Sequence, residues 1–410
     1  MSETSQSNDK YQKVLADLEN AFQTLQEENQ RQQERIKSLA GAIRDLRAMR
    51  ENDASKTPKI TGTIKQQVFR DRINKLFRNG GVYEVQERLW LRPSSLDSTP
   101  AFIPISQRPT NSNGASTRFI SFINFKGGVG KTTLVANIGA ALAAGQYDLP
   151  GKNKARPLRV LFVDLDFQAT LTDRCVDQSL LVANGKSNIF KQKTVASLFD
   201  YPPKLSIAQL LLPVLCEKNA SIIRSADALD VKDAEAFMKL ACGLIDTRFY
   251  FRAWFHKPEV LSQFDLVIFD CPPRLTASTV CALTVSDYAF IPTSPDLFDQ
   301  SPITRTNTFI QRISKELNTP CQVGGVILNR TNKEGSLTSK EKNFVERINL
   351  MAKEDGDSNL NFLRTYVPRR SGDKDSIIGN IGEPLPGGNP KRPLPFLNNL
   401  ASEIYARIYQ

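Results

Sequence analysis

A glycine-rich octapeptide, KGGVGKTT, occupies residues 126–133 of the 410-residue chain. The apolar run RFISFINF leads directly into it, and the helix-like run LVANIGAALAA follows it. This order of strand, glycine turn and helix is the setting of a phosphate-binding loop, because glycines let successive backbone N–H groups point at phosphate oxygens beside a helix N-terminus. We therefore expect Lys131 to reach the β and γ phosphates of a nucleotide, and the Thr132 hydroxyl to ligate Mg²⁺.

Three carboxylates lie at the ends of two apolar, strand-like segments. Asp164 and Asp166 end the segment RVLFVDLD, and Asp270 ends the segment FDLVIFD. In open α/β sheets ligands bind beyond the carboxyl ends of the strands, so we expect these carboxylates at the same edge as the glycine loop. Cys271, which follows Asp270, is interpreted as a small buried residue rather than a reactive thiol.

The loop departs from the general pattern G-x-x-x-x-G-K-[ST]. Phe125 occupies the first glycine position, and Lys126 directly precedes the glycine pair. This form resembles the deviant Walker A loop of the ParA/MinD family of ATPases. The resemblance implies an ATP-sandwich dimer, in which Lys126 reaches across the interface to the nucleotide bound by the partner.

The acidic segments resemble two further motifs of the same family. The segment DLDFQ resembles the motif D-x-D-P-Q, with Phe167 in place of proline, and DCPP resembles the family's Walker B motif. The resemblance implies that Asp166 orients or deprotonates the attacking water. It also implies that Mg²⁺ is held by Thr132, Asp164 and Asp270.

Two later segments match the order of the family's base-binding positions. Asn329 ends the strand-like run GVILN, where the resemblance implies an adenine contact, although an Asn after a strand is more often a turn residue. Pro368 lies in YVPRR, similar to the segment that packs over the base. Candidate DNA contacts, which could equally form a solvated basic turn, are Arg369, Arg370 and Lys374. The expected nucleotide-binding residues are Lys126, Gly127, Gly128, Val129, Gly130, Lys131, Thr132, Thr133, Asn329 and Pro368, with Lys126, Lys131 and Asp166 as catalytic residues.

Strand-like apolar runs alternate with helical stretches after residue 117. This pattern predicts an α/β fold over residues 118–410, a P-loop NTPase with a mainly parallel, doubly wound sheet covered on both faces. The stretch 167–263 is longer than in a minimal family member, and no function is assigned to it. A stripe of Leu397, Leu400, Ile404 and Ile408 predicts a core-facing or dimer-facing helix near the C-terminus. The expected strands are 118–125, 159–164, 264–270, 288–292, 323–328 and 363–367.

The residues before this domain divide into three parts. Residues 1–55 contain a heptad repeat with leucines at d positions and Asn29 at an a position, which predicts an α-helical extension with a parallel coiled coil. A single amphipathic helix packed on its own domain is the alternative. Residues 56–92 are basic and form either a small DNA-binding module or a solvated helix that packs the coil against the rest. Residues 93–117, rich in Pro, Ser, Thr and Asn, are interpreted as a linker.

Composition restricts the partners and the chemistry. A net charge of +11 favours polyanions, either nucleic acid or an acidic surface. Six cysteines without a C-x-x-C pair and a single histidine, His256, argue against a zinc site, a disulfide framework and most Ser-His-Asp hydrolase schemes. His256 itself is interpreted as a surface residue. No apolar run reaches the roughly 20 residues of a membrane span, and the N-terminus is polar, so we expect a soluble, cytoplasmic protein.

The combined motifs resemble ParA-type partition ATPases over about residues 117–410. The resemblance implies a slow ATPase that dimerises around ATP, binds nucleoid DNA without sequence preference and is stimulated by a ParB-like partner during DNA segregation. One alternative is MinD-like membrane positioning, which requires a basic amphipathic C-terminal helix, yet only Arg407 supplies positive charge there. Another is an ATP-regulated repressor or partner-complex regulator that acts through the N-terminal region.

Overall fold

The computed structural model divides the chain into two units, Met1–Gly81 and Val82–Gln410. The residues that it describes all belong to the second unit: 87, 90–91, 101–111, 114–148, 155–177, 179–180, 193–200, 205–215, 217–241, 245–295, 300–333, 335–354, 360–369 and 395–409. The predicted coiled coil, most of the basic module, the first part of the predicted linker, and the candidate DNA contacts Arg370 and Lys374 lie outside these residues.

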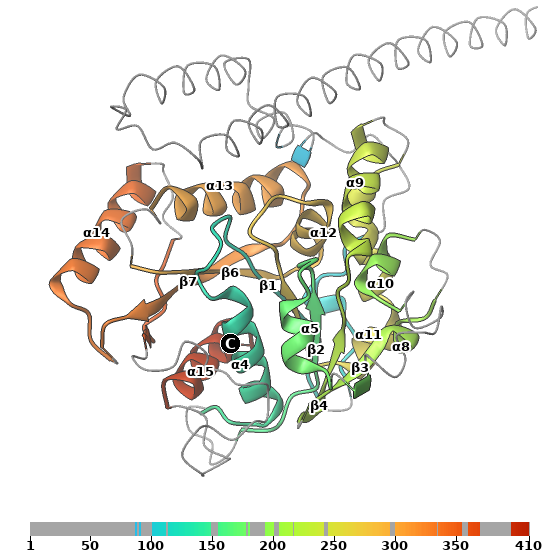
Figure 1. The fold of residues 1–410 in the computed structure, drawn as a ribbon, viewed down its shortest axis with the longest axis horizontal. Helices are drawn as coiled ribbons and strands as arrows, with labels where there is room; N and C mark the ends of the chain where they lie inside the picture. The colour runs from blue at the N-terminus through green and yellow to red at the C-terminus, as the bar shows by residue number, and fades with distance from the viewer. Residues whose placement is uncertain are drawn as a thin grey trace, which may run out of the picture. The chain divides into compact units, whose positions relative to one another are not determined.

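A single sheet of eight strands forms the centre of the described part of the chain (Figure 1). Its strands lie in the order β3-β4-β2-β5-β1-β6-β7-β8, and every neighbouring pair is parallel except β3–β4. The strands are β1 (Arg118–Phe122), β2 (Val160–Asp164), β3 (Leu211–Val214), β4 (Glu217–Ile223), β5 (Leu266–Asp270), β6 (Tyr288–Thr293), β7 (Gln322–Thr331) and β8 (Val367–Pro368).

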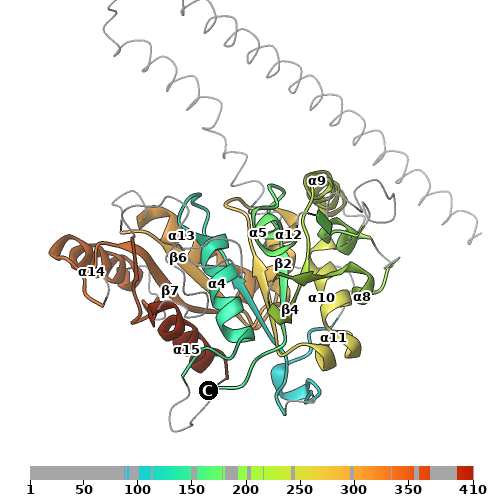
Figure 2. The ribbon, with the colours of Figure 1, turned by 60° about the horizontal axis from the view of Figure 1, so that its bottom comes forward.

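Helices cover both faces of this sheet because its central strands are apolar on both sides (Figure 2). Successive residues of β5 enter different hydrophobic clusters: Leu266 and Ile268 pack on one face, and Val267 and Phe269 on the other. The helices are α4 (Lys131–Ala143), α5 (Thr170–Cys175), α8 (Ile207–Leu210), α9 (Ala228–Ala241), α10 (Tyr250–Phe255), α11 (Pro258–Gln263), α12 (Ala277–Val285), α13 (Gln300–Glu316), α14 (Ser339–Glu354) and α15 (Pro395–Tyr409), with 3₁₀ turns η1 (Ile105–Gln107), η2 (Val195–Phe199) and η3 (Thr247–Phe249).

The predicted parallel, doubly wound sheet is confirmed, and β1, β2, β5, β6 and β7 fall at the expected positions, whereas β8 overlaps the expected strand 363–367 only at Val367. The antiparallel pair β3–β4, within the stretch 167–263, was not predicted. Strand β3 contains Pro213, which lacks a backbone donor and suits a sheet edge, and β4 begins with the polar residues Glu217 and Lys218. Neither segment therefore shows the apolar run by which the other strands were recognised.

Helix α15 packs into the core against α4 through its apolar stripe. Leu397, Leu400, Ile404 and Ile408 are all buried, in the same cluster as Leu134 of α4. The core-facing interpretation of this helix is confirmed. The apolar stripe is buried in the protein core and is not exposed for contact with a membrane. Among the helices in the described ranges, none is both long enough and apolar enough to cross a membrane.

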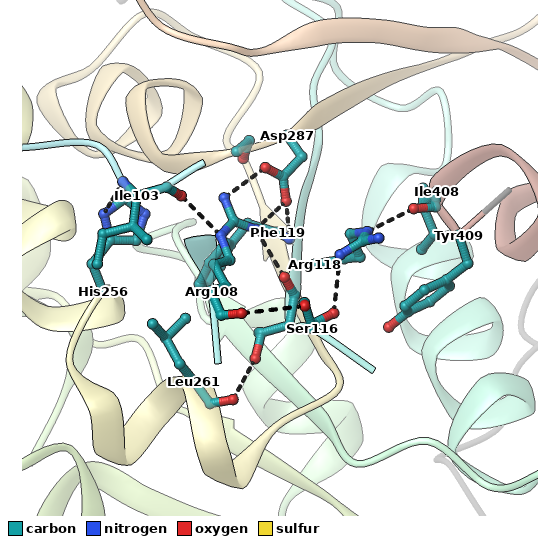
Figure 3. A network of polar contacts seen from close by, with 12 residues as sticks. Ile103, Arg108, Ser116, Arg118, Phe119, His256, Leu261, Asp287, Ile408 and Tyr409 are labelled. Carbon is teal, nitrogen blue, oxygen red and sulfur yellow. Dashed lines mark hydrogen bonds and ion pairs between the residues drawn. The ribbon is translucent and has the colours of Figure 1, made fainter. Parts of the chain in front are cut away.

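The described part of the predicted linker is bonded to the sheet at the amino ends of its strands (Figure 3). Arg108 is buried and donates two hydrogen bonds of 2.7 Å to the carboxylate of Asp287, and it also donates to the Thr117 carbonyl at 2.8 Å. The Asn111 amide donates to Asp265 at 2.8 Å. Residues 101–111 and 114–117 thus form part of the α/β domain rather than a solvated connection.

The expectation that His256 lies at the surface is wrong. The residue is only 7% exposed, and its ring contacts Phe102 and Phe119 at centroid distances of 5.0 and 5.7 Å. Burial, and then the nearby Arg108 charge, lower the pKa of His256 to about 3. Residues 101–108 cover His256, and the sequence next to the histidine does not indicate this contact.

Candidate nucleotide-binding site

The glycine loop connects the end of β1 to the start of α4, as the motif predicts. Gly128 and Gly130 both adopt positive φ angles, 75° and 86°, which glycine tolerates without steric cost. A Cβ atom on Gly130 would lie 2.3 Å from the Asn329 side-chain nitrogen. Because Gly130 has no side chain to cap α4, the N–H groups of the first helical turn remain suited to an anion.

Lys131 turns back over this loop. Its ammonium donates to the carbonyl oxygens of Asn124, at 3.1 Å, and Lys126, at 3.0 Å, and the residue is buried. Burial lowers the pKa of Lys131, whereas the carboxylate of Asp270 has the opposite effect. The side-chain nitrogen of Lys131 therefore already lies inside the loop, where a phosphate would be held.

Asn124 fixes the loop to the sheet, a role that the sequence analysis did not identify. Its buried amide donates to the Pro292 carbonyl of β6 at 2.8 Å and accepts the N–H of Lys126 at 2.9 Å. An amide inside the apolar run RFISFINF is the sequence signal that could have revealed it. The carbonyl of the same residue accepts the bond from Lys131, so Asn124 makes two hydrogen bonds within the loop and one to β6.

Asp270 lies at the foot of the loop, paired in register with Phe122 at the end of β1. The residue is 1% exposed, and neither carboxylate oxygen has a hydrogen-bond partner among the described residues. Burial, and then the carboxylate of Asp164, raise the pKa of Asp270 to about 8, and the Thr132 hydroxyl and Lys131 oppose the rise. Two buried oxygens without partners beside a hydroxyl are suited to a hard cation.

Asp164 lies beside Asp270 but is bonded differently. One of its oxygens accepts the N–H and the hydroxyl of Thr172, at 2.9 and 2.7 Å, and the other accepts the N–H of Asp166 at 3.2 Å. Burial raises the pKa of Asp164 to about 7 despite these bonds. In this structure Asp164 thus holds the start of α5 and the turn that carries Asp166.

Asp166 is half-buried at the same edge of the sheet. It accepts the N–H of Gln168 at 3.1 Å, and its charge acts on the pKa values of both Lys131 and Asp270. The structure therefore brings the glycine loop and all three predicted carboxylates together. In the described ranges no three His, Cys, Asp or Glu side chains form a metal cluster. The carboxylates beside the glycine loop nevertheless fit Mg²⁺, because this ion typically takes only one or two carboxylates together with water and phosphate oxygens.

The residues expected near the base lie on the other side of the loop. Asn329 is buried and donates to the Val129 carbonyl at 2.9 Å, and it pairs with Val367 between β7 and β8. Pro368 follows directly, so the two predicted base-side positions are neighbours. Arg369 is exposed, and its backbone N–H donates to the Thr331 carbonyl at 2.7 Å.

The chain is similar to known partition proteins. The AAA_31 family, described as AAA domain, matches residues 117–323. An uncharacterized protein of Mycobacterium tuberculosis is 30% identical over 231 residues, which are 56% of this chain and 63% of that protein, so less than two thirds of that relative is covered. The sporulation initiation inhibitor protein Soj of Bacillus subtilis is 28% identical over 224 residues, 52% of this chain and 72% of Soj. The chromosome partitioning protein ParA of Caulobacter vibrioides is 27% identical over 228 residues, 54% of this chain and 73% of ParA.

A solved structure is similar at a lower level. Cobyrinic acid a,c-diamide synthase from Mycobacterium smegmatis, with bound ATP analog and magnesium, has 22% identity and a TM-score of 0.47. The match covers 62% of this chain and 88% of the synthase. The family assignment depends instead on the AAA domain match, which includes the glycine loop and all three carboxylates. The chain therefore belongs to the AAA_31 family, with the P-loop fold of the ParA/MinD type, and is similar to partition proteins.

Proposed function

We propose that this protein is a partition ATPase that works as a nucleotide switch. It forms an ATP-sandwich dimer, binds DNA without sequence preference, and hydrolyses ATP slowly until a ParB-like partner stimulates it. Support comes from relatives named as chromosome partitioning proteins and from the assembled phosphate loop. The observation that carries the proposal is the buried carboxylate of Asp270, which lies beside Lys131 and Thr132 and accepts no hydrogen bond of normal geometry from the described residues.

The loop and its lysine bind the triphosphate. The N–H groups of residues 127–133 surround the phosphate oxygens, and Lys131 exchanges its two carbonyl partners for the β and γ phosphates. Thr132 and Asp270 hold Mg²⁺, with Asp164 behind them on the neighbouring strand. When bound, the ion neutralises charge on the phosphates. Asn329 and Pro368 contact the adenine.

The hydrolysis step depends on positioning. Asp166 orients or deprotonates the attacking water from its half-buried place after β2, and Lys126 completes the site of the partner subunit in the closed dimer. Since phosphoryl transfer needs mainly alignment and charge neutralisation, a partner that improves this alignment accelerates it. A ParB-like protein would act in this way.

DNA binding depends on charge. The basic balance of the chain supports contact with DNA phosphates, and Arg369, Arg370 and Lys374 are the candidate contacts at the nucleoid. Residues 56–92 could add a further basic module, and the coiled coil of residues 1–55 would keep two chains together without ATP. Nucleotide would then change the shape of the dimer rather than its stoichiometry.

Retention on immobilised, non-specific DNA tests the proposal. Retention should require ATP and Mg²⁺, fall steeply as salt rises, and fail in Lys131→Ala. The matched control is Lys218→Ala. Lys218 is exposed at the amino end of β4, at the edge of the sheet opposite to the phosphate loop. Equal retention of the wild-type chain with and without nucleotide would contradict a nucleotide switch.

Hydrolysis is measured separately, with and without DNA. Phosphate release should be slow for the chain alone and should be lost in Asp166→Ala. Lys218→Ala again provides the control, because this residue lies away from the loop. If Asp166→Ala hydrolyses ATP as fast as the wild type, the role assigned to that carboxylate is wrong.

A further inference from the structure

Arg274 makes contacts that the family motifs do not require. It follows Cys271-Pro272-Pro273 at the end of β5, and its guanidinium carbon lies 4.7 Å from the centroid of the Phe167 ring. One guanidinium nitrogen also pairs with the carboxylate of Asp230 on α9 at 2.5 Å. The two charged side chains are 43% and 56% exposed, and such exposed ion pairs contribute little to stability. We therefore consider which parts of the site the contacts of Arg274 with Phe167 and Asp230 hold in position.

The stacked pair joins the two acidic loops of the candidate site. Phe167 directly follows Asp166 in the loop after β2, and Arg274 is in the loop after Asp270. A guanidinium over an aromatic face is attracted by the ring's quadrupole, so the contact resists separation of the two loops. A proline, the residue that the family motif has in place of Phe167, could not provide this face.

Helix α9 supports the arginine from the other side. Asp230 and Asp233 are three residues apart and therefore lie on one face of the helix. Asp233 is buried and accepts the N–H and the hydroxyl of Ser278, at 2.6 and 3.1 Å, in the first turn of α12. Helix α9 thus binds the segment after β5 twice, once through Arg274 and once through the start of α12.

We propose that Arg274 is a positioning residue for ATP hydrolysis, held by α9, and that it keeps the Asp166 loop in place relative to Asp270 through Phe167. This inference rests on the proposed function. It also gives a role to part of the stretch 167–263, since α9 belongs to that stretch. Arg274 acts through the two carboxylate loops and is not itself assigned a contact with nucleotide.

Steady-state hydrolysis of ATP by the full chain provides the first test. Arg274→Ala should lower kcat about tenfold with KM changed less than about twofold, because misplacement affects the attack rather than binding. Phe167→Leu should lower kcat similarly, the double variant should show no further loss, and Phe167→Tyr should retain wild-type turnover. The matched control is Arg312→Ala. Arg312 lies on α13, away from both loops; its side chain is 44% exposed and forms an ion pair with Glu87.

Three outcomes would overturn the inference. The first is that both kcat and KM are unchanged in Arg274→Ala. The second is a raised KM with unchanged kcat, which would mean that Arg274 contacts the nucleotide directly. The third is additive losses of kcat in the double variant. The Phe167→Leu and Phe167→Tyr pair repeats the test without altering the charged residue.

A second test distinguishes this inference from the proposed function. Hydrogen exchange of nucleotide-free protein should become faster in Arg274→Ala at residues 165–169, where the Ala169 N–H donates to the Asp166 carbonyl at 2.9 Å. Arg312→Ala should leave exchange there unchanged. If the wild-type chain does not hydrolyse ATP, the proposed function fails while this result still stands. If exchange in Arg274→Ala is unchanged, the positioning role fails by itself.

Discussion

Asp164 and Asp270 occupy the same register position on the neighbouring parallel strands β2 and β5, and both are buried. Their oxygens nevertheless have different surroundings. Those of Asp164 accept three hydrogen bonds, from Thr172 and Asp166, whereas those of Asp270 accept none from the described residues. This difference separates a carboxylate that holds a turn from one that can accept a cation.

Substitution of each carboxylate by its amide should have a different effect. Asp270→Asn should weaken Mg²⁺-dependent ATP binding at least tenfold, which is about 1.4 kcal/mol, with little change in Tm. Asp164→Asn should lower the free energy of unfolding by about 1–3 kcal/mol, because one oxygen acceptor at Thr172 or Asp166 is lost. Calorimetric titration and thermal unfolding of both variants check this. The reverse pattern would mean that the two roles are exchanged.

The pH dependence of stability should report on Asp233. Burial raises the pKa of Asp233 from its ordinary value of 3.8 to about 7; the Asp230 charge adds to this rise, and the Ser278 hydrogen bonds and the Arg274 charge oppose it. The folded chain therefore holds this proton more tightly than the unfolded chain does. The resulting stabilisation is complete below about pH 4 and is lost as the pH rises through 7.

From pH 6 to pH 8 the wild type should lose about 1 kcal/mol more free energy of unfolding than Asp233→Asn, as measured by urea denaturation. The asparagine cannot titrate yet can still accept the Ser278 N–H. The neighbouring Cys281 thiol, whose pKa burial raises well above its usual value, stays neutral over this interval. Parallel pH profiles for the two proteins would contradict the assignment.

Trp90 should stabilise the α/β domain although it precedes the predicted linker. It is 1% exposed, its ring lies 5.3 Å from that of Phe237, and its carbonyl accepts a 2.9 Å hydrogen bond from Arg248. Trp90→Ala should lower the free energy of unfolding by about 3–5 kcal/mol in chemical denaturation. Glu87→Ala, which removes only a partly exposed ion pair, should cost at most about 1 kcal/mol. Equal effects would mean that Trp90 is not part of the folded core.

Gly130→Ala should impair nucleotide binding more than backbone strain alone can explain. The new Cβ combines a φ of 86° with a 2.3 Å approach to the Asn329 amide, so the loop or β7 must shift. Gly335→Ala is the control, because its φ of 68° is similar and no atom of the described residues lies within 4 Å of the new Cβ. ATP affinity should fall at least tenfold, about 1.4 kcal/mol, only in Gly130→Ala. Equal losses of ATP affinity in the two variants would mean that the close approach of Gly130 to Asn329 does not affect nucleotide binding.

The sequence predicted those parts of the site that are encoded locally. The glycine loop and the carboxylates at the strand ends are contiguous motifs, and parallel strands bring their carboxyl ends to one edge of a sheet. The stack between Phe167 and Arg274 could not be predicted, because it depends on two strands becoming neighbours and on α9 reaching the second loop. The burial of His256 escaped prediction for a similar reason, since residues 101–108 that cover it lie far away in sequence.

Titration calorimetry with ATP and Mg²⁺ measures whether residues 126–133 bind nucleotide. The wild-type chain should bind one ATP per protomer, Lys131→Ala should lose most of the affinity, and Lys218→Ala should bind as the wild type does. No heat of binding by the folded wild-type chain at millimolar ATP and Mg²⁺, or equal affinity in Lys131→Ala, would contradict a nucleotide site at residues 126–133.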